Sequence, residues 1–255
     1  MAGRTFVVGD IHGDLVHLEA LFEGLPPLDA DDTVVFLGDY LDRGPQSAQV
    51  VDFVRTRLPA RTAAKVVALR GSHEDAWLKV RRQGWLEFVL PVGNGCMATV
   101  RSFRGGPPPG AGEFPSADEF NAMAEGSFFP DAVVRWMESL PVFYEDAHAI
   151  YVHAGLPKIG DRWAHPSELA DPKPLLWQRT EEFFRSYRGK RVVFGHTVVE
   201  ALPQELSVYT PEDAADLYFK EDLIGIDTRC GHGGFLTAVE LPGLVVYESR
   251  SVLPR

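Results

Sequence analysis

Cysteines, long apolar runs and positive charge are all scarce in this chain. Its 255 residues include two cysteines, Cys96 and Cys230, which are too few for a secreted disulfide scaffold. No apolar signal segment precedes the first predicted strand, and no apolar run is long enough to cross a bilayer. We therefore expect a cytoplasmic protein with no membrane partner.

The shortage of positive charge narrows the range of partners. Lys and Arg number 25 against 36 Asp and Glu, which gives a net charge of −11 at pH 7. Such a chain lacks the general basic surface that nucleic-acid binding requires, so we expect no nucleic-acid partner. Hydrophobic residues make up 45% of the chain, which is enough to bury a sizeable core. The length, together with the lack of a linker-like stretch, favours a single domain over residues 1–255.

The first third of the chain alternates between short apolar strands and amphipathic helices. Strands are predicted at Thr5–Val8, Thr33–Leu37 and Lys65–Leu69, with helices over Asp14–Phe22, from Pro45 onward and over Glu74–Arg82. This alternation indicates an α/β sheet with mainly parallel strands. Ligands of such folds gather at the carboxyl ends of the strands, so we look for a site there.

The rest of the chain follows a different pattern. Residues 104–127 are rich in proline and glycine, which predicts either a lid over a site or a solvated insertion without a part in the chemistry. Further elements are predicted as a helix over Pro130–Leu140, strands over Ala149–Val152 and Val192–Phe194, and an antiparallel set of Leu223–Ile226, Phe235–Leu241 and Leu244–Glu248. We predict an α/β fold built on a two-sheet β-sandwich core flanked by helices.

Five short motifs, each placed where a predicted strand ends, carry the chemistry. They are Gly9-Asp10-Ile11-His12-Gly13, Gly38-Asp39-Tyr40-Leu41-Asp42-Arg43-Gly44, Gly71-Ser72-His73-Glu74, His153-Ala154-Gly155 and Gly195-His196-Thr197. Asp10 and His12 are two residues apart and can grip one ion together. Asp39 can bridge two ions because a carboxylate has two oxygens. His153 and His196 add imidazole ligands from later strands.

This ligand set predicts two divalent metal ions. Mixed carboxylate and imidazole ligation suits Mn²⁺, Fe or Zn²⁺, and we take Mn²⁺ as the first choice. Ca²⁺ suits the set less well because it prefers an all-oxygen shell. Two ions roughly 3.5–4 Å apart can hold a hydroxide between them and clamp a phosphoryl oxygen. They also lower the pKa of bound water, so a nucleophile exists near neutral pH.

Four further residues suit proton transfer and phosphate binding. His73 can protonate a leaving alkoxide, and Asp42 can hold the His73 imidazole and favour its protonated form. Arg43 offers a planar fork that matches phosphate oxygens. Arg179, in Leu176-Trp177-Gln178-Arg179, is a second phosphate-binding candidate that a purely structural role explains equally well.

Taken as a set, the motifs resemble those of the phosphoprotein phosphatase (PPP) family of binuclear metallophosphoesterases, in its compact bacterial form. These enzymes belong to the calcineurin-like phosphoesterase superfamily. The shared motifs are Gly-Asp-x-His-Gly, Gly-Asp-Tyr-x-Asp-Arg-Gly, Gly-Asn-His-Glu, His-Ala-Gly and Gly-His-Thr, beginning at Gly9, Gly38, Gly71, His153 and Gly195. The resemblance implies a first ion on Asp10, His12 and Asp39, and a second on Asp39, Ser72, His153 and His196. It further implies an acid dyad of His73 with Asp42, and phosphate contacts from Arg43 and Arg179.

Position 72 departs from the family's pattern. The family has Asn there, whose carbonyl oxygen binds the second ion and whose amide can reach the substrate phosphate. Ser72 has a shorter side chain, and its hydroxyl is a poorer ligand. We therefore expect weaker occupancy of the second metal site, or a water that fills the gap, and slower turnover.

The resemblance leaves three functions open for this phosphoesterase. Our first choice is a serine/threonine protein phosphatase that also hydrolyses small aryl phosphates, because Tyr40, Asp42 and Glu74 match that branch. The alternative is a symmetrical diadenosine tetraphosphate hydrolase, whose members commonly show Gly-Asp-Leu-x-x-Arg-Gly and Gly-Asn-His-Asp. The third is a metal- or phosphate-binding module impaired through Ser72, although the chain retains the predicted acid dyad.

Overall fold

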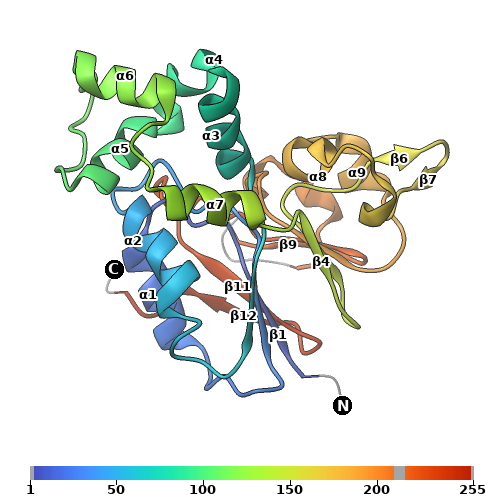
Figure 1. Cartoon of the computed structure of the whole chain (residues 1–255). Coiled ribbons are helices and arrows are strands. Elements are labelled where there is room, and N and C mark those ends of the chain that lie inside the picture. Colours follow the sequence, from blue (N-terminus) through green and yellow to red (C-terminus); the bar gives the residue numbers. More distant parts are fainter. Residues whose placement is uncertain (1–2, 210–215, 254–255) are drawn as a thin grey trace.

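Two five-stranded sheets pack face to face, with helices on both outer sides. The computed structural model describes residues 3–209 and 216–253. The first sheet has the order β12-β11-β1-β2-β3, and the second has the order β4-β5-β8-β10-β9. The predicted α/β sandwich flanked by helices is therefore confirmed (Figure 1).

The first sheet is built from the strand–helix units at the start of the chain and a hairpin from its end. Its strands are β1 (Thr5–Val8), β2 (Thr33–Phe36), β3 (Lys65–Ala68), β11 (Thr237–Leu241) and β12 (Val245–Glu248). Strands β1, β2 and β3 run parallel, whereas β11 pairs antiparallel with both β1 and β12. The parallel strands aim their carboxyl ends at one edge, so the first three motifs meet there.

The helices after these strands begin close to the predicted positions. They are α1 (Leu15–Gly24), α2 (Ser47–Asp52), which continues as a π-helical turn over Phe53–Arg57, and α3 (Ser72–Gln83). The Asp14 carboxylate accepts a hydrogen bond from the His17 amide and caps α1. Helix α3 begins two residues before the predicted Glu74, so Ser72 and His73 occupy its first turn.

The strand predicted at Leu223–Ile226 belongs to the second sheet. Its strands are β4 (Phe143–Glu145), β5 (Ile150–Val152), β8 (Val192–Phe194), β9 (Tyr218–Lys220) and β10 (Leu223–Gly225). The prediction that β10 joins β11 and β12 in one antiparallel set is wrong, because β10 pairs parallel with β8 and antiparallel with β9. The Gly-rich segment between β10 and β11 lets the chain cross from one sheet to the other.

Short helices and a small hairpin cover the outer side of the second sheet. They are α8 (Lys173–Trp177), α9 (Glu181–Ser186) and the hairpin β6 (Lys158–Ile159) and β7 (Arg162–Trp163). Phe183 and Phe184 of α9 pack on Phe194 of β8, with ring centroids 5.7 and 5.6 Å from it. A second apolar layer lies between the two sheets and includes Val35 and Val193.

A group of helices stands above the site edge of the first sheet (Figure 1). Its members are α4 (Leu86–Val89), α5 (Cys96–Arg104), α6 (Ala117–Glu125) and α7 (Asp131–Ser139), with a 3₁₀ turn over Val92–Asn94. The prediction of loop structure across 104–127 is wrong for its second half, which forms α6. Ser116 and Glu119 close a capping box at the start of that helix. Among the described residues, no helix is long and apolar enough to cross a membrane.

Candidate metal centre

The five motifs converge on one buried site between the two sheets. Asp10 and His12 follow β1, Asp39 follows β2, Ser72 and His73 open α3 after β3, His153 follows β5, and His196 follows β8. All of these residues are buried, and each is at most 6% exposed. Strands from both sheets therefore bring polar side chains together in one buried region, where each needs a partner.

The backbone around the site is held in left-handed conformations that non-glycine residues rarely adopt. The φ angles are 48° at His12, 53° at Asp39, 71° at Asp42, 68° at Arg43 and 62° at His196. Each such conformation costs free energy and persists only where the surrounding structure enforces it. Their concentration in the motifs indicates a site shaped for chemistry.

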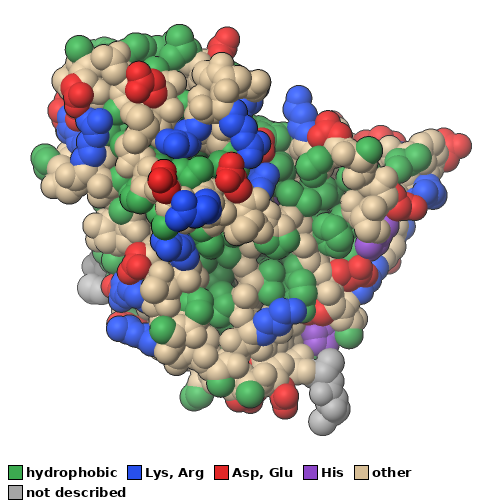
Figure 2. All heavy atoms as spheres, in the orientation of Figure 1, with side chains coloured by type: hydrophobic (Ala, Val, Ile, Leu, Met, Phe, Trp, Pro, Cys, Tyr) green, Lys and Arg blue, Asp and Glu red, His purple; other side chains and the backbone are tan. Residues whose placement is uncertain are grey.

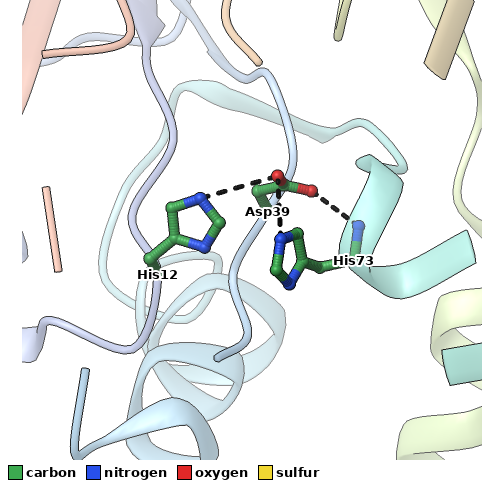
Figure 3. A group of neighbouring side chains, drawn as sticks. All are labelled: His12, Asp39 and His73. Atoms are coloured by element: carbon green, nitrogen blue, oxygen red, sulfur yellow. Dashed lines mark hydrogen bonds and ion pairs between the residues drawn. The ribbon is translucent and has the colours of Figure 1, made fainter. Parts of the chain in front are cut away.

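Asp39 lies at the centre of the cluster. Its Oδ2 is 3.6 Å from His12 Nε2 and 4.0 Å from His73 Nε2, and its Oδ1 is 3.4 Å from His153 Nε2. Figure 3 shows the His12 and His73 imidazoles directed at this carboxylate. His12, Asp39 and His73 form one group with metal-ligand spacing, and Asp39, His153 and His196 form another. Because the two groups share Asp39, they have the arrangement that a bridged pair of ions requires.

Backbone carbonyls fix which nitrogen two of the imidazoles offer. His12 Nδ1 donates to the Leu41 carbonyl at 2.9 Å, and His153 Nδ1 donates to the Leu37 carbonyl at 3.0 Å. This leaves Nε2 of each ring to face the Asp39 carboxylate, and His153 Nε2 also lies 3.2 Å from His196 Nδ1. Histidine ligands of metals are oriented in the same way by hydrogen bonds to the nitrogen that does not bind the ion.

Two buried polar atoms at the site lack any partner among the described residues. They are Asp10 Oδ1 and His196 Nε2, although Asp10 Oδ2 accepts from the His196 amide at 2.9 Å. Asp10 belongs to neither tight group, and its free oxygen lies against Gly195, where an added Cβ would come within 2.0 Å of it. An orphaned carboxylate oxygen is costly in a buried site, and a bound cation would satisfy it, whereas His196 faces the cluster with Nδ1, 3.2 Å from His153 Nε2. The donor set therefore fits two divalent ions.

The charges at the site also call for cations. Burial followed by the nearby charge of Asp227 raises the pKa of Asp10 well above its usual range. Burial opposes ionisation of Asp39 too, but the imidazoles of His153 and His73 outweigh it and hold the Asp39 pKa well below its usual range. For His153, burial is outweighed by Asp39 and Asp10, which raise its pKa to about 9. The carboxylates thus favour protons on Asp10 and His153, and bound cations would supply the same positive charge.

His73 and Asp42 form the predicted pair. His73 Nδ1 lies 2.7 Å from Asp42 Oδ2, and Trp77 Nε1 and Thr99 Oγ1 also donate to this carboxylate. Burial disfavours the charged imidazole, but Asp39 and the hydrogen bond to Asp42 together raise the His73 pKa. The Asp42 carboxylate therefore orients the His73 ring with Nε2 toward Asp39 and favours the protonated imidazole.

Two supporting acids were not predicted to act at the site. The Glu74 carboxylate accepts hydrogen bonds from the amides of Asp39, Tyr40 and Gly71 at 2.9–3.0 Å, so it locks the second motif onto the third. Asp227 is buried just after β10, and its charge acts on Asp10. A carboxylate directly after a strand was the available signal for Asp227, and the placement of that strand in the wrong set concealed it.

Ser72 sits among the ligands but makes only weak contacts. Its Oγ is 3.3–3.4 Å from the two Asp39 oxygens and 3.3 Å from His196 Nδ1. These distances exceed those of a good hydroxyl hydrogen bond. The hydroxyl therefore occupies the predicted ligand position without filling it tightly.

Two arginines lie next to the cluster. Arg43 is half-buried, and its charge, after burial, is the next cause of the lowered pKa of His12. Its guanidinium has no hydrogen-bond partner among the described residues. Arg179 lies 3.5 Å from His196 Nδ1 and 3.3 Å from Thr197 Oγ1. That these two cations bind a substrate phosphate stays a prediction.

The fold and the site are those of a known protein family. The family pattern described as Calcineurin-like phosphoesterase matches residues 3–200, and this chain belongs to that family. The predicted family and fold are thereby confirmed, and so is a phosphoesterase-type site, whereas the role of each residue stays a prediction.

Similarity to particular proteins extends over nearly the whole chain. It is 24% identical to the asymmetrical bis(5'-nucleosyl)-tetraphosphatase PrpE of Geobacillus thermodenitrificans, over 97% of this chain and 94% of that protein. The PrpE protein of Anoxybacillus flavithermus is 26% identical over the same shares. A solved structure described as a putative diadenosine tetraphosphatase superposes with a TM-score of 0.57 at 23% identity, covering 97% of this chain and 93% of that one. This solved structure therefore shares the fold of the chain.

A shorter match is to a protein phosphatase. A protein phosphatase 2A catalytic protein of Dictyostelium discoideum is 39% identical over 71 residues. Those residues are 27% of this chain and 22% of that protein, so the match is confined to a small part of each.

Proposed function

We propose that this chain hydrolyses the phosphoanhydride bonds of dinucleoside tetraphosphates and does so asymmetrically. The observation that carries the proposal is the similarity to PrpE proteins over 97% of the chain. The match to a protein phosphatase covers only 27% of it. This replaces our first choice from the sequence, a serine/threonine protein phosphatase, and differs from the symmetrical alternative in the bond that breaks.

Each residue has a physical task in this reaction. Asp10, His12, Asp39, Ser72, His153 and His196 would hold the ions, which supply Lewis acidity and lower the pKa of water when bound. Arg43 and Arg179 hold the phosphate oxygens by charge-assisted hydrogen bonds. Water contributes the oxygen that bonds to phosphorus, and the bridging oxygen leaves with the product nucleotide. His73 Nε2 gives that oxygen its proton when the leaving group needs one.

A protein phosphatase remains the second candidate because one observation favours it. The 39% identity to the phosphatase 2A protein is higher than the identity to the PrpE proteins, although it is limited to 71 residues. The dyad of His73 and Asp42 at 2.7 Å would serve a phosphoserine substrate well, because an alkoxide leaving group needs a proton.

A comparison of substrates tests the proposal. Mn²⁺-loaded protein is given diadenosine tetraphosphate, a phosphothreonine peptide and p-nitrophenyl phosphate, and the products are separated by chromatography. We expect the highest kcat/KM with the dinucleotide, and equal amounts of ATP and AMP as its products. Two ADP per dinucleotide would support the symmetrical alternative, and preference for the peptide would support the second candidate. The absence of turnover, with Asn at position 72 as well, would favour a binding module.

Replacement of Ser72 by Asn tests the weak ligand position. Because the amide oxygen reaches further than the hydroxyl, we expect Ser72→Asn to bind the second ion about tenfold more tightly, with faster turnover. Isothermal titration of Mn²⁺ into metal-free protein measures the affinity. Ser139→Asn, at an exposed serine in α7, is the matched control and should leave both quantities unchanged. If neither affinity nor turnover rose in Ser72→Asn, position 72 would not be a metal ligand.

A further inference from the structure

An apolar pocket lies beside the metal centre, enclosed by the helical group above the first sheet. Its volume is about 350 Å³, within the range of small-ligand sites. Leu90 and Val92 line it from the turn after α4, Met97 from α5, and Phe120 and Met123 from α6. The proline-rich segment over residues 108–115 closes another side, so the insertion noted in the sequence forms a wall of this pocket.

Arg43 connects the pocket to the metal centre. It lines the pocket, while its charge reaches His12 and His73 on the other side. The chain before α5 packs directly on it, since a Cβ at Gly95 would lie 2.2 Å from the Arg43 amide nitrogen. The His73 ring also contacts Phe88 edge-on, with centroids 5.4 Å apart, and Val89 next to Phe88 lines the pocket. A substrate phosphate on Arg43 therefore has the pocket as its neighbour.

We infer that this pocket binds one nucleoside of the substrate, with the adjoining phosphate held by Arg43. The inference rests on the proposed function and adds to it the place of the base. Of the described residues that line the pocket, Arg43 alone carries a positive charge, so an occupant has one anionic end and an otherwise apolar body. A nucleotide has this form, with flat faces that pack on aromatic rings and sulfur atoms.

The polar edge of the pocket also suits a nucleoside. Glu113 is the one acidic side chain among the described lining residues, and it is held by Arg101 and by the Gly110 amide at 2.7 Å. Its carboxylate is a fixed acceptor for a ribose hydroxyl or an amino group of a base. A base therefore finds both an apolar slot and a hydrogen-bond acceptor.

The rim carries apolar side chains that the fold leaves in solvent. Leu90 is 58% exposed, Val92 is 66% exposed, and Phe114 beside the pocket is 80% exposed. Figure 2 shows hydrophobic side chains at the top of the molecule, over α4 and α6. Exposed apolar groups gathered at the mouth of a pocket mark a binding site.

Methionine signals provide a direct test. The chain has four methionines, of which Met97 and Met123 line the pocket, Met137 is buried in α7 outside it, and Met1 lies outside the described residues. Zn²⁺-loaded protein labelled with ¹³C at the methionine methyl groups is titrated with AMP, with inorganic phosphate and with phenyl phosphate. We expect AMP to shift the NMR signals of the Met97 and Met123 methyl groups but not the signal of Met137. Inorganic phosphate should leave all three methyl signals unshifted.

A charge placed at the rim provides the matched variant. Val92→Glu sets a carboxylate beside the entering phosphate, so we expect AMP to bind at least about fivefold more weakly by the same titration. Val208→Glu makes the same change at a valine of nearly the same exposure, 67% against 66%, outside the pocket and should bind AMP like the unaltered protein. Neither substitution removes a buried contact, so both variants should fold.

The outcomes separate this inference from the proposed function. If the enzyme cleaves the dinucleotide but AMP leaves Met97 and Met123 unmoved, the pocket is not the nucleoside site and the proposed function stands. If AMP shifts them and no dinucleotide is cleaved, the site stands and the proposed function fails. Shifts produced by phenyl phosphate at lower concentration than by AMP would overturn the nucleoside in favour of an aryl group. Equal binding by the two glutamate variants would also contradict it.

Discussion

Asp39→Asn should reduce turnover by about 10³-fold or more, the largest loss expected from one substitution. The reason is that Asp39 faces three imidazoles at 3.4–4.0 Å and is shared by both ligand groups. An amide lacks the charge needed to bridge two cations, and such cations contribute several kcal/mol to transition-state stabilisation. Initial rates with diadenosine tetraphosphate and p-nitrophenyl phosphate at saturating Mn²⁺ measure the loss.

A matched control separates loss of the site from loss of the fold. Asp52→Asn makes the same chemical change at an exposed residue at the end of α2 and should retain full activity. Circular dichroism and thermal melting should show Asp39→Asn folded. If the folded Asp39→Asn protein kept more than about a tenth of its activity, Asp39 would not bridge the ions.

His73→Asn should show a loss that depends on the leaving group. A general acid contributes about 10²–10⁴-fold when the departing oxygen needs a proton. Phenyl phosphate should therefore lose about that much in kcat. p-Nitrophenyl phosphate should lose much less, because its phenolate departs readily without protonation. Comparison of kcat for the two esters measures this difference.

The control for His73 is a histidine away from the cluster. His165→Asn alters an imidazole that pairs with Glu145 at 2.8 Å near the hairpin of β6 and β7, and it should change neither rate. Equal losses on both esters in His73→Asn would indicate that His73 positions the ligands and does not donate the proton.

The clustering of the candidate ligands could be predicted because each of them lies in a short motif that follows a strand. An apolar strand followed by Gly-Asp or Gly-His can be recognised in the sequence alone. Parallel strands bring such ends together in the fold. The sequence thus located His153 and His196 beside Asp39, although more than a hundred residues separate His153 from Asp39 along the chain.

The roles of Glu74 and Asp227 could not be predicted, because they depend on contacts between segments that are far apart in the sequence. Glu74 reaches three amides from two separate motifs, which requires both loops in their final conformations. Asp227 joins the site because β10 crosses to the second sheet, and alternation of strand residues does not determine which sheet a strand joins. For α6, the capping box of Ser116 and Glu119 was present in the sequence, but the nearby prolines and glycines outweighed it.

The most direct test of the central claim is a titration of metal-free protein with Mn²⁺, followed by turnover of p-nitrophenyl phosphate at each step. We predict that the metal-free protein is inactive, that two ions bind per chain, and that activity appears with the second, weaker ion. The loose contacts of Ser72 are the reason that we expect this second step to need more metal. Full turnover in the presence of a strong chelator, or saturation of activity at one ion per chain, would contradict a binuclear phosphoesterase centre.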